Sequence, residues 1–208
     1  MTRSVLIADD HPLFRQALGL AVDRVLPDAR VVEAGTLAAA AKAVGESGDL
    51  ALILLDLKMP GAVGYSGIAL LHAEKPEVPI LVVSSADGAA AAAEVRAFGA
   101  IGFLHKDSDL ATIEQAIAAA LGAPPAPQPR SDEPVDTVRS TVAGLTPTQL
   151  KVLLAVLEGQ LNKQIAYNLG MSEATVKAHM TAIMRKLDVS NRTQAALVAR
   201  SLGLDLRH

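Results

Sequence analysis

Short apolar runs alternate with longer segments of helical periodicity over the first 122 residues. Leu50 to Leu55, a run of six apolar residues, is typical of a strand buried on both faces of a parallel sheet. Further short apolar runs lie at 4–8, 31–32, 79–85 and 101–104. The segments between them favour helices, as where Phe14, Leu18 and Val22 share one helical face. The pattern predicts an α/β fold in which five strands alternate with five helices in a doubly wound parallel sheet.

A change of composition separates this part from the rest of the chain. Residues 123–144 contain the Pro-rich stretch PPAPQP and the polar stretch RSDEP without apolar periodicity, which indicates an extended linker. Residues 145–208 contain four short helical segments with good capping residues at Thr146, Ser172 and Asn191. A helix, a glycine turn and a further helix with basic residues predict a helix-turn-helix unit. We therefore expect domains at 1–122 and 145–208, with the linker at 123–144.

Composition and charge narrow the environment and the partners. The chain has no Cys, which excludes disulfides and thiolate metal sites. No apolar run approaches a membrane span, and the first strand follows Met1 too closely for a signal peptide, so we expect a cytoplasmic protein without membrane contact. Residues 1–122 carry 9 Lys and Arg against 15 Asp and Glu (−6), whereas residues 145–208 carry 8 against 4 (+4). This asymmetry favours an acidic chemical half and a basic half with an anionic partner.

Polar side chains follow several of the predicted strands. Asp56 ends the buried strand and, taken alone, is best explained as a helix cap. Asp9 and Asp10 end the first strand, however, and Ser85 and Lys106 follow two later ones. In doubly wound sheets the carboxyl ends of the strands form the ligand site, and three clustered carboxylates need a counter-charge. Mg²⁺ is the natural cation for oxygen ligands, and an Asp beside it can carry a phosphoryl group.

These motifs together resemble the receiver domain of two-component response regulators. The resemblance rests on Asp9-Asp10, the D-x-K-M-P-G motif at Asp56, Ser85-Ala86 and the F-x-x-K motif ending at Lys106. It implies that Asp56 is the phosphoacceptor, and that Mg²⁺ is bound by Asp9, Asp10, Asp56 and the backbone carbonyl of Lys58. It implies further that Lys106 and Ser85 contact the phosphoryl group, and that Phe103 is a two-state switch element. Ser84 competes with Ser85 for the hydroxyl role.

One segment departs from the receiver pattern. The family usually has a tight P-G-x-x-G turn after the acceptor strand, whereas the loop from Gly61 to Gly67 is about three residues longer. The following helix is correspondingly short. We expect this loop to alter access to the site, dephosphorylation or partner docking.

The basic half resembles the LuxR-type helix-turn-helix of NarL/FixJ regulators, from Leu145 to about Leu204. Gln149 departs from the family, which commonly has Glu there. Helical periodicity gives one apolar stripe (Val176, Met180, Ile183, Met184 and Leu187) and an opposite face with small and cationic residues. The resemblance places Lys177, Ala178 and Thr181 toward the bases of double-stranded DNA. Phosphate contacts are expected from Asn162, Lys163 and Thr175, and Arg185 can reach phosphates or base edges.

The sequence thus indicates a response regulator rather than an enzyme. A sensor histidine kinase would phosphorylate Asp56, and the modified receiver would promote homodimerisation and DNA binding. Two alternatives differ in their chemistry. The complete acidic site argues against a phosphorylation-independent DNA-binding regulator, whereas the altered loop after Asp56 keeps this alternative open. An Asp-nucleophile phosphohydrolase of the haloacid dehalogenase type is disfavoured, because Lys58 occupies the position where a second Asp is required.

Overall fold

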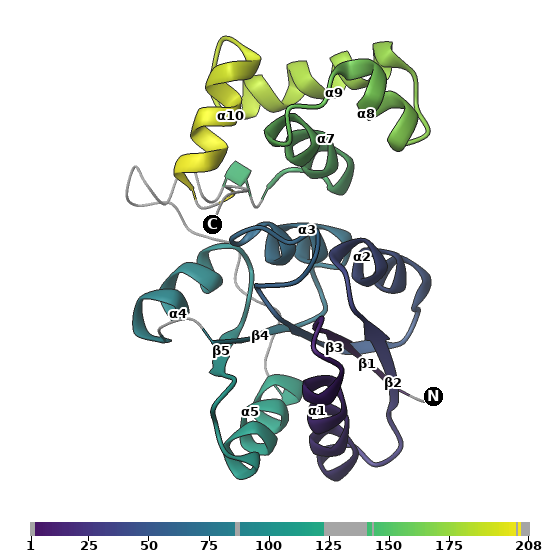
Figure 1. The fold of residues 1–208 in the computed structure, drawn as a ribbon, viewed down its shortest axis with the longest axis vertical. Coiled ribbons are helices and arrows are strands. Elements are labelled where there is room, and N and C mark those ends of the chain that lie inside the picture. Colours follow the sequence, from purple (N-terminus) through teal and green to yellow (C-terminus); the bar gives the residue numbers. More distant parts are fainter. Residues whose placement is uncertain (1–2, 86–87, 123–140, 143, 203, 205–208) are drawn as a thin grey trace.

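The N-terminal half of the computed structural model is a five-stranded parallel sheet with helices on both faces (Figure 1). The structure describes residues 3–85, 88–122, 141–142, 144–202 and 204. The strands are β1 (Ser4–Ala8), β2 (Arg30–Ala34), β3 (Leu50–Leu55), β4 (Ile80–Ser84) and β5 (Gly102–His105). Their order across the sheet is β2-β1-β3-β4-β5, which confirms the predicted doubly wound α/β architecture.

Two apolar clusters bind the helices to the opposite faces of this sheet. One face carries α1 (Pro12–Val25) and α5 (Leu110–Gly122), and the other carries α2 (Leu37–Glu46), α3 (Ser66–Glu74) and α4 (Gly88–Ala97) (Figure 1). Alternate residues of the central strand divide between these clusters, so that Leu52 and Leu54 face α1 and α5 while Ile53 and Leu55 face the other side. Every one of these four side chains is buried, as expected for the central strand of a parallel sheet.

The described part of the C-terminal half contains a bundle of four helices: α7 (Pro147–Leu157), α8 (Asn162–Asn168), α9 (Glu173–Lys186) and α10 (Arg192–Ser201). The predicted caps are present, because the side chains of Thr146, Ser172 and Asn191 each accept a hydrogen bond from the third residue after them. Val142, three residues before the expected start of this domain at Leu145, is fully buried in its core.

Helix α3 joins the two halves by packing against α7 (Figure 1). Seven consecutive α3 residues, from Ser66 to His72, are buried, so this short helix has almost no exposed face. Lys151 on α7 adds an ion pair with Glu74 at the end of α3, with 2.7 Å between Nζ and Oε1. An all-round apolar helix must be covered on every side, and α7 supplies the outer cover.

Most element boundaries lie within one residue or two of those expected from the sequence. The second strand is longer than expected (30–34 rather than 31–32), because β1 pairs with it along its whole length. The fourth strand ends at Ser84, so that Ser85 begins the loop beyond it. The proposed linker lies almost entirely outside the described residues. Within the described part of the chain, no helix is both long and apolar enough to span a membrane.

Candidate functional site

Two buried carboxylates and one lysine meet at the carboxyl end of the sheet. Asp9 follows β1 and Asp56 follows the adjacent β3, and the two side chains are only 1% and 2% exposed. Lys106, which follows β5, places its Nζ atom 2.6 Å from Asp9 Oδ2 and 2.8 Å from Asp56 Oδ2. The sequence prediction that these residues converge on one edge is therefore correct in its geometry.

The charges of Asp9 and Asp56 explain the protonation state of Lys106. Burial is the largest single influence on the pKa of its ammonium and lowers it, but hydrogen bonds and charges from Asp56 and Asp9 together outweigh burial. The pKa of Lys106 is consequently raised above its ordinary value, and the side chain is a permanent cation at neutral pH. One ammonium thus neutralises part of the charge of two buried carboxylates.

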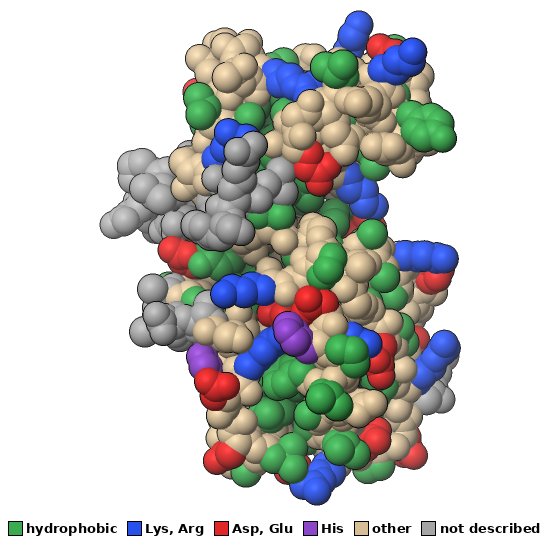
Figure 2. Space-filling model, viewed as in Figure 1, with side chains coloured by type: hydrophobic (Ala, Val, Ile, Leu, Met, Phe, Trp, Pro, Cys, Tyr) green, Lys and Arg blue, Asp and Glu red, His purple; other side chains and the backbone are tan. Residues whose placement is uncertain are grey.

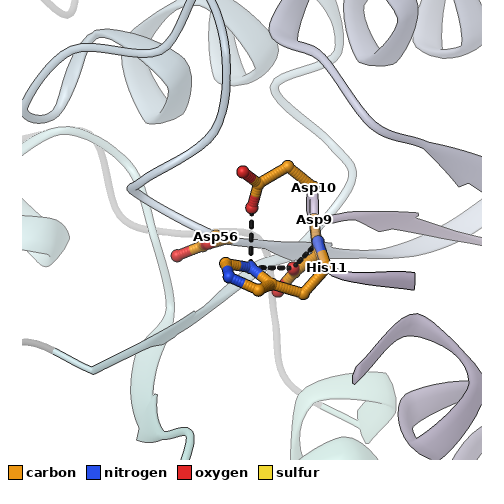
Figure 3. A group of neighbouring side chains, drawn as sticks. All are labelled: Asp9, Asp10, His11 and Asp56. Carbon is orange, nitrogen blue, oxygen red and sulfur yellow. Dashed lines mark hydrogen bonds and ion pairs between the residues drawn. The ribbon is translucent and has the colours of Figure 1, made fainter. Parts of the chain in front are cut away.

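Asp10 and His11 complete a cluster that could bind a divalent cation (Figure 3). One ligand atom from each of Asp9, Asp10, His11 and Asp56 lies within 4.8 Å of the others. His11 Nδ1 lies 2.7 Å from Asp10 Oδ1 and 3.3 Å from Asp9 Oδ1. Asp9 Oδ2 and Asp10 Oδ1 are buried carboxylate oxygens that face Lys106 Nζ at 2.6 Å and His11 Nδ1 at 2.7 Å, respectively. Oxygen atoms of this kind fit a hard cation such as Mg²⁺.

Two residues of α1 support the site and were not identified from the sequence. Arg15 donates a hydrogen bond of 2.7 Å to the backbone carbonyl of Asp9 and forms an ion pair with Glu33 on β2. The ring centroid of Phe14 lies 4.9 Å from Lys106 Nζ, in cation–π geometry. Their positions next to the acidic pair were the available signal, but the helical pattern alone assigned Phe14 to the core.

The backbone after Asp56 turns back onto the carboxylate. The N–H of Lys58 donates a 3.1 Å hydrogen bond to Asp56 Oδ1, and the Lys58 side chain is exposed, in keeping with a role for its backbone rather than its ammonium. Phe103 is half-buried and packs against the apolar cluster on the α2, α3 and α4 side. Phe103 therefore lies within β5 and packs on one face of the sheet, whereas Lys106 follows the strand and contacts the two carboxylates at its carboxyl end.

The two candidate hydroxyl groups differ in exposure. Ser84 is fully buried at the end of β4, and its backbone carbonyl accepts a hydrogen bond from the N–H of Lys106. Ser85 is exposed at the start of the following loop. Among the described residues, no hydrogen bond joins Ser85 to Asp56.

The lengthened loop has its own ordered structure. Gly61 and Gly64 adopt positive φ angles (83° and 52°), and the Leu37 N–H at the start of α2 donates to the Pro60 carbonyl. At the end of the loop, the Tyr65 ring stacks on Phe98 with centroids 5.3 Å apart, and its hydroxyl donates to Glu94 on α4. Pro60 thus attaches the segment after Asp56 to α2, and Tyr65 attaches it to α4.

The second candidate site is the outer face of α9. Its apolar stripe packs inward as predicted, with Val176, Met180, Ile183 and Leu187 buried. The opposite face, with Lys177, Ala178, Thr181 and Arg185, is exposed, and Lys and Arg side chains project from this end of the molecule (Figure 2). A face of small residues flanked by cations can approach DNA closely.

Neighbouring polar residues of this domain are partly engaged with one another. Asn162 Oδ1 accepts a 2.9 Å hydrogen bond from Arg192 of α10, whereas Lys163 is exposed. Thr175 is exposed, and its hydroxyl lies 2.8 Å from that of Ser172. Gln149, the departure from the family pattern, accepts a hydrogen bond from Lys186 Nζ at 3.0 Å. The neutral side chain therefore keeps a polar contact with α9.

A doubly wound sheet with a carboxylate and lysine site at its carboxyl edge, followed by helices with an exposed basic face, defines a two-domain regulator of the receiver and helix-turn-helix class. Residues 5–118 match the response regulator receiver domain, and residues 143–199 match the bacterial regulatory proteins of the luxR family. The chain belongs to the response regulators that combine a receiver with a LuxR-type DNA-binding domain.

Similar proteins cover nearly the whole chain. It is 39% identical over 207 residues to the glycerol metabolism activator of Pseudomonas putida, covering 94% of both chains. It is 32% identical to the nitrate/nitrite response regulator NarP of Escherichia coli, covering 93% of both. The solved structure of the RcsB response regulator of Salmonella typhimurium is similar with a TM-score of 0.52 and 25% identity, over 98% of this chain and all (100%) of that one.

Proposed function

We propose that this protein is a phosphorylation-gated transcription regulator in which Asp56 is the phosphoacceptor. A sensor histidine kinase donates the phosphoryl group, and the modified receiver promotes homodimerisation and sequence-specific binding to double-stranded DNA. The observation that carries the proposal is the contact of Lys106 with both Asp56 and Asp9 at the carboxyl end of the sheet. The 39% identical relative is named an activator, which supports an output in transcription.

The transfer needs a nucleophile and a cation placed beside it. An Asp56 oxygen attacks the phosphorus of a phosphohistidine, the P–N bond breaks, and the released imidazole nitrogen takes up a proton. Lys106 lies where it can neutralise the oxygens of the incoming group, because its Nζ is already 2.8 Å from Asp56 Oδ2. Ser85, which is exposed at the same edge, supplies a hydroxyl donor to the phosphoryl oxygens.

Asp9, Asp10, Asp56 and the backbone carbonyl of Lys58 would hold Mg²⁺. The cation supplies neutralisation of the negative charge that gathers on the phosphoryl group. The clustering of carboxylate oxygens from Asp9, Asp10 and Asp56, whose ligand atoms lie within 4.8 Å of one another, supports this assignment. Asp9 is nearly inaccessible and Asp10 is 34% exposed, so the two carboxylates differ in their access to water.

Phe103 is proposed as the element that changes position after phosphorylation, together with Ser85. Its half-buried ring packs against the cluster that also contains α3, so movement of Phe103 can alter the packing of that helix. In the proposed DNA complex, Lys177, Ala178 and Thr181 face the bases. Phosphates are contacted by Asn162, Lys163, Thr175 and Arg185.

Within this proposal the receiver spans 1–122, the linker 123–144 and the DNA-binding domain 145–208. The matched ranges 5–118 and 143–199 and the buried Val142 support this division with a C-terminal start that is two to three residues earlier.

Labelling with radioactive acetyl phosphate tests the acceptor. We expect the wild-type chain and an Asp107→Asn control to incorporate label in the presence of Mg²⁺, and Asp56→Asn to incorporate none. Asp107 is a suitable control because it is an exposed carboxylate next to Lys106. Persistent labelling of Asp56→Asn would refute the acceptor assignment.

Beryllofluoride, which imitates the phosphoryl group, separates the gated regulator from a phosphorylation-independent one. The gated regulator dimerises and binds DNA more tightly when Mg²⁺ and beryllofluoride are added, whereas the alternative does not respond. Single Ser84→Ala and Ser85→Ala variants then locate the hydroxyl donor. We expect weaker beryllofluoride binding in Ser85→Ala, and a loss confined to Ser84→Ala would move the role to Ser84.

A further inference from the structure

Lys106 has one partner whose charge cannot change. Besides the carboxylates of Asp9 and Asp56, its ammonium faces the ring of Phe14, with Nζ 4.9 Å from the ring centroid. Phe14 comes from the first turns of α1 and packs against the apolar cluster between α1, α5 and the sheet. The helix and the strand ends therefore enclose Lys106 between two anions and one aromatic face.

The anionic partners are the groups that the proposed phosphorylation alters. When Asp56 carries a phosphoryl group and Asp9 contributes to a cation site, the salt bridges that fix Lys106 in the resting state are exchanged for others. A lysine side chain has four rotatable bonds and readily leaves such a position for water. The Phe14 face attracts the ammonium by its quadrupole in every one of these states.

We propose that Phe14 is a positioning residue for phosphoryl transfer: its ring holds the Lys106 ammonium beside the acceptor while the carboxylates change partners. This proposal rests on the proposed function of Asp56 for its consequence, but the contact itself exists in the unmodified protein. Phe14 does not touch the reacting atoms, and it acts only through the location of Lys106.

A displaced Lys106 in a Phe14 variant could also result from lost packing, and truncation of the Phe14 side chain alone would not separate this effect from the loss of the cation–π contact. The side chain is half-buried and contributes to the α1 cluster, so a loss of packing could also disturb Lys106. Three substitutions separate the two effects. Phe14→Leu keeps an apolar side chain and removes the ring, Phe14→Tyr keeps the ring, and trifluorophenylalanine at position 14 keeps the shape but weakens the negative face.

The first measurement needs neither metal nor phosphate. In the full chain with EDTA, the reactivity of the Lys106 amine toward acetic anhydride is followed by peptide mass spectrometry. We expect Lys106 to react about fivefold faster in Phe14→Leu and in the trifluorinated protein, from a contact of this strength, and to keep the wild-type reactivity in Phe14→Tyr. Lys58, exposed at the same edge of the sheet, provides the internal reference.

The second measurement is the rate of phosphorylation by acetyl phosphate with Mg²⁺. The variants should divide into the same two groups. We expect phosphorylation to be about fivefold slower in Phe14→Leu and the trifluorinated protein than in the wild type and Phe14→Tyr. Wild-type Lys106 reactivity in the trifluorinated protein would overturn the proposal, because that protein has the shape of Phe14 without its electrostatics. If the wild-type chain is not labelled at Asp56 at all, the proposed function fails, while the amine reactivity still tests the Phe14 contact.

Discussion

Removal of Lys106 should destabilise the receiver because this lysine is the shared cation of two buried carboxylates. In Lys106→Met, the side chain keeps its approximate length and apolar stem but loses the charge. Asp9 and Asp56, at 1% and 2% exposure, then face each other without the ammonium that lies 2.6 and 2.8 Å away. Like charges in a buried site repel, and neither carboxylate can recover full hydration without opening the site.

The size of the effect follows from the burial of the three groups. Breaking a buried ion pair by removing one partner costs about 3–5 kcal/mol of folding free energy. The site reaches solvent along one side, since the Lys106 side chain is 12% exposed and that of Asp10 is 34% exposed. We therefore expect a loss at the lower end, about 3 kcal/mol, which corresponds to a fall of about 10 °C in the melting temperature of a domain of this size.

Tyrosine fluorescence provides an assay that reports on the receiver alone. The chain has no Trp and two Tyr, of which Tyr65 lies in the receiver and Tyr167 in the DNA-binding domain. In a Tyr167→Phe background, urea unfolding followed at Tyr65 therefore reports on the receiver alone, with EDTA present to remove divalent cations. Lys58→Met is the matched control, because it deletes an exposed lysine from the same edge of the sheet and should change stability by less than about 0.5 kcal/mol.

Two further measurements would decide whether the lost charge of Lys106 causes the lower stability of Lys106→Met. Adding Asp56→Asn to Lys106→Met should restore at least half of the loss, because one of the two unpaired carboxylates is then neutral. Mg²⁺ should bind more tightly to Lys106→Met than to the wild type, since the ammonium no longer competes for Asp9. A Lys106→Met chain that unfolds within about 1 kcal/mol of the wild type in EDTA would refute the reasoning.

Three other outcomes follow from single residues. Burial lowers the pKa of His72, so the folded chain resists protonation of this side chain, whereas the unfolded chain protonates it near pH 6.5. The free energy of unfolding should therefore fall as the pH drops below about 6.5. Urea titrations at several pH values should show a smaller fall of that free energy in His72→Gln. A Cβ on Gly99, at φ 104°, would lie 2.5 Å from His72 Cγ. Gly99→Ala should therefore lower the free energy of unfolding in urea by about 2–4 kcal/mol. Gly45→Ala, where a Cβ would lie in open space on α2, is the control and should cause no such loss. In binding titrations, Lys177→Ala should weaken binding to the operator by about 1–3 kcal/mol relative to binding to non-specific DNA. Lys163→Ala should weaken binding to operator and non-specific DNA alike, and should reduce the slope of log K against log salt concentration by about 1.

Hydrophobic periodicity predicted the sheet because β1, β3 and β4 are largely apolar runs, followed directly by Asp9, Asp56 and Ser85, respectively. Asp56 and Lys106 could be brought together from the sequence alone, since parallel strands place their carboxyl ends on one edge. These features depend on local pattern and on topology.

Other features depend on how the helices pack against the sheet, and the hydrophobic pattern of the sequence could therefore not predict them. The contact of Phe14 with Lys106 needs the rotation of α1 against the sheet, which periodicity fixes only to about one face. Similarly, the lengthened loop could be recognised by counting residues, but the attachment of Tyr65 to α4 required coordinates. One available signal was overlooked: SGIALLHAE in α3 has no polar face, which already indicated a second layer over this helix.

The burial of α3 constrains how phosphorylation can influence DNA binding. The loop after Asp56 leads directly into α3, and α3 is covered by α7, with the ion pair of Glu74 and Lys151 at its end. A rearrangement near Asp56 therefore has a short path to the DNA-binding domain through packed side chains. Lys177 and Thr181 of α9 are nevertheless exposed in this arrangement, so the receiver does not cover the face that we propose to contact DNA. Control through α3 must then act on where the DNA-binding domain is held, and on its freedom to pair with a second copy, rather than on access to α9.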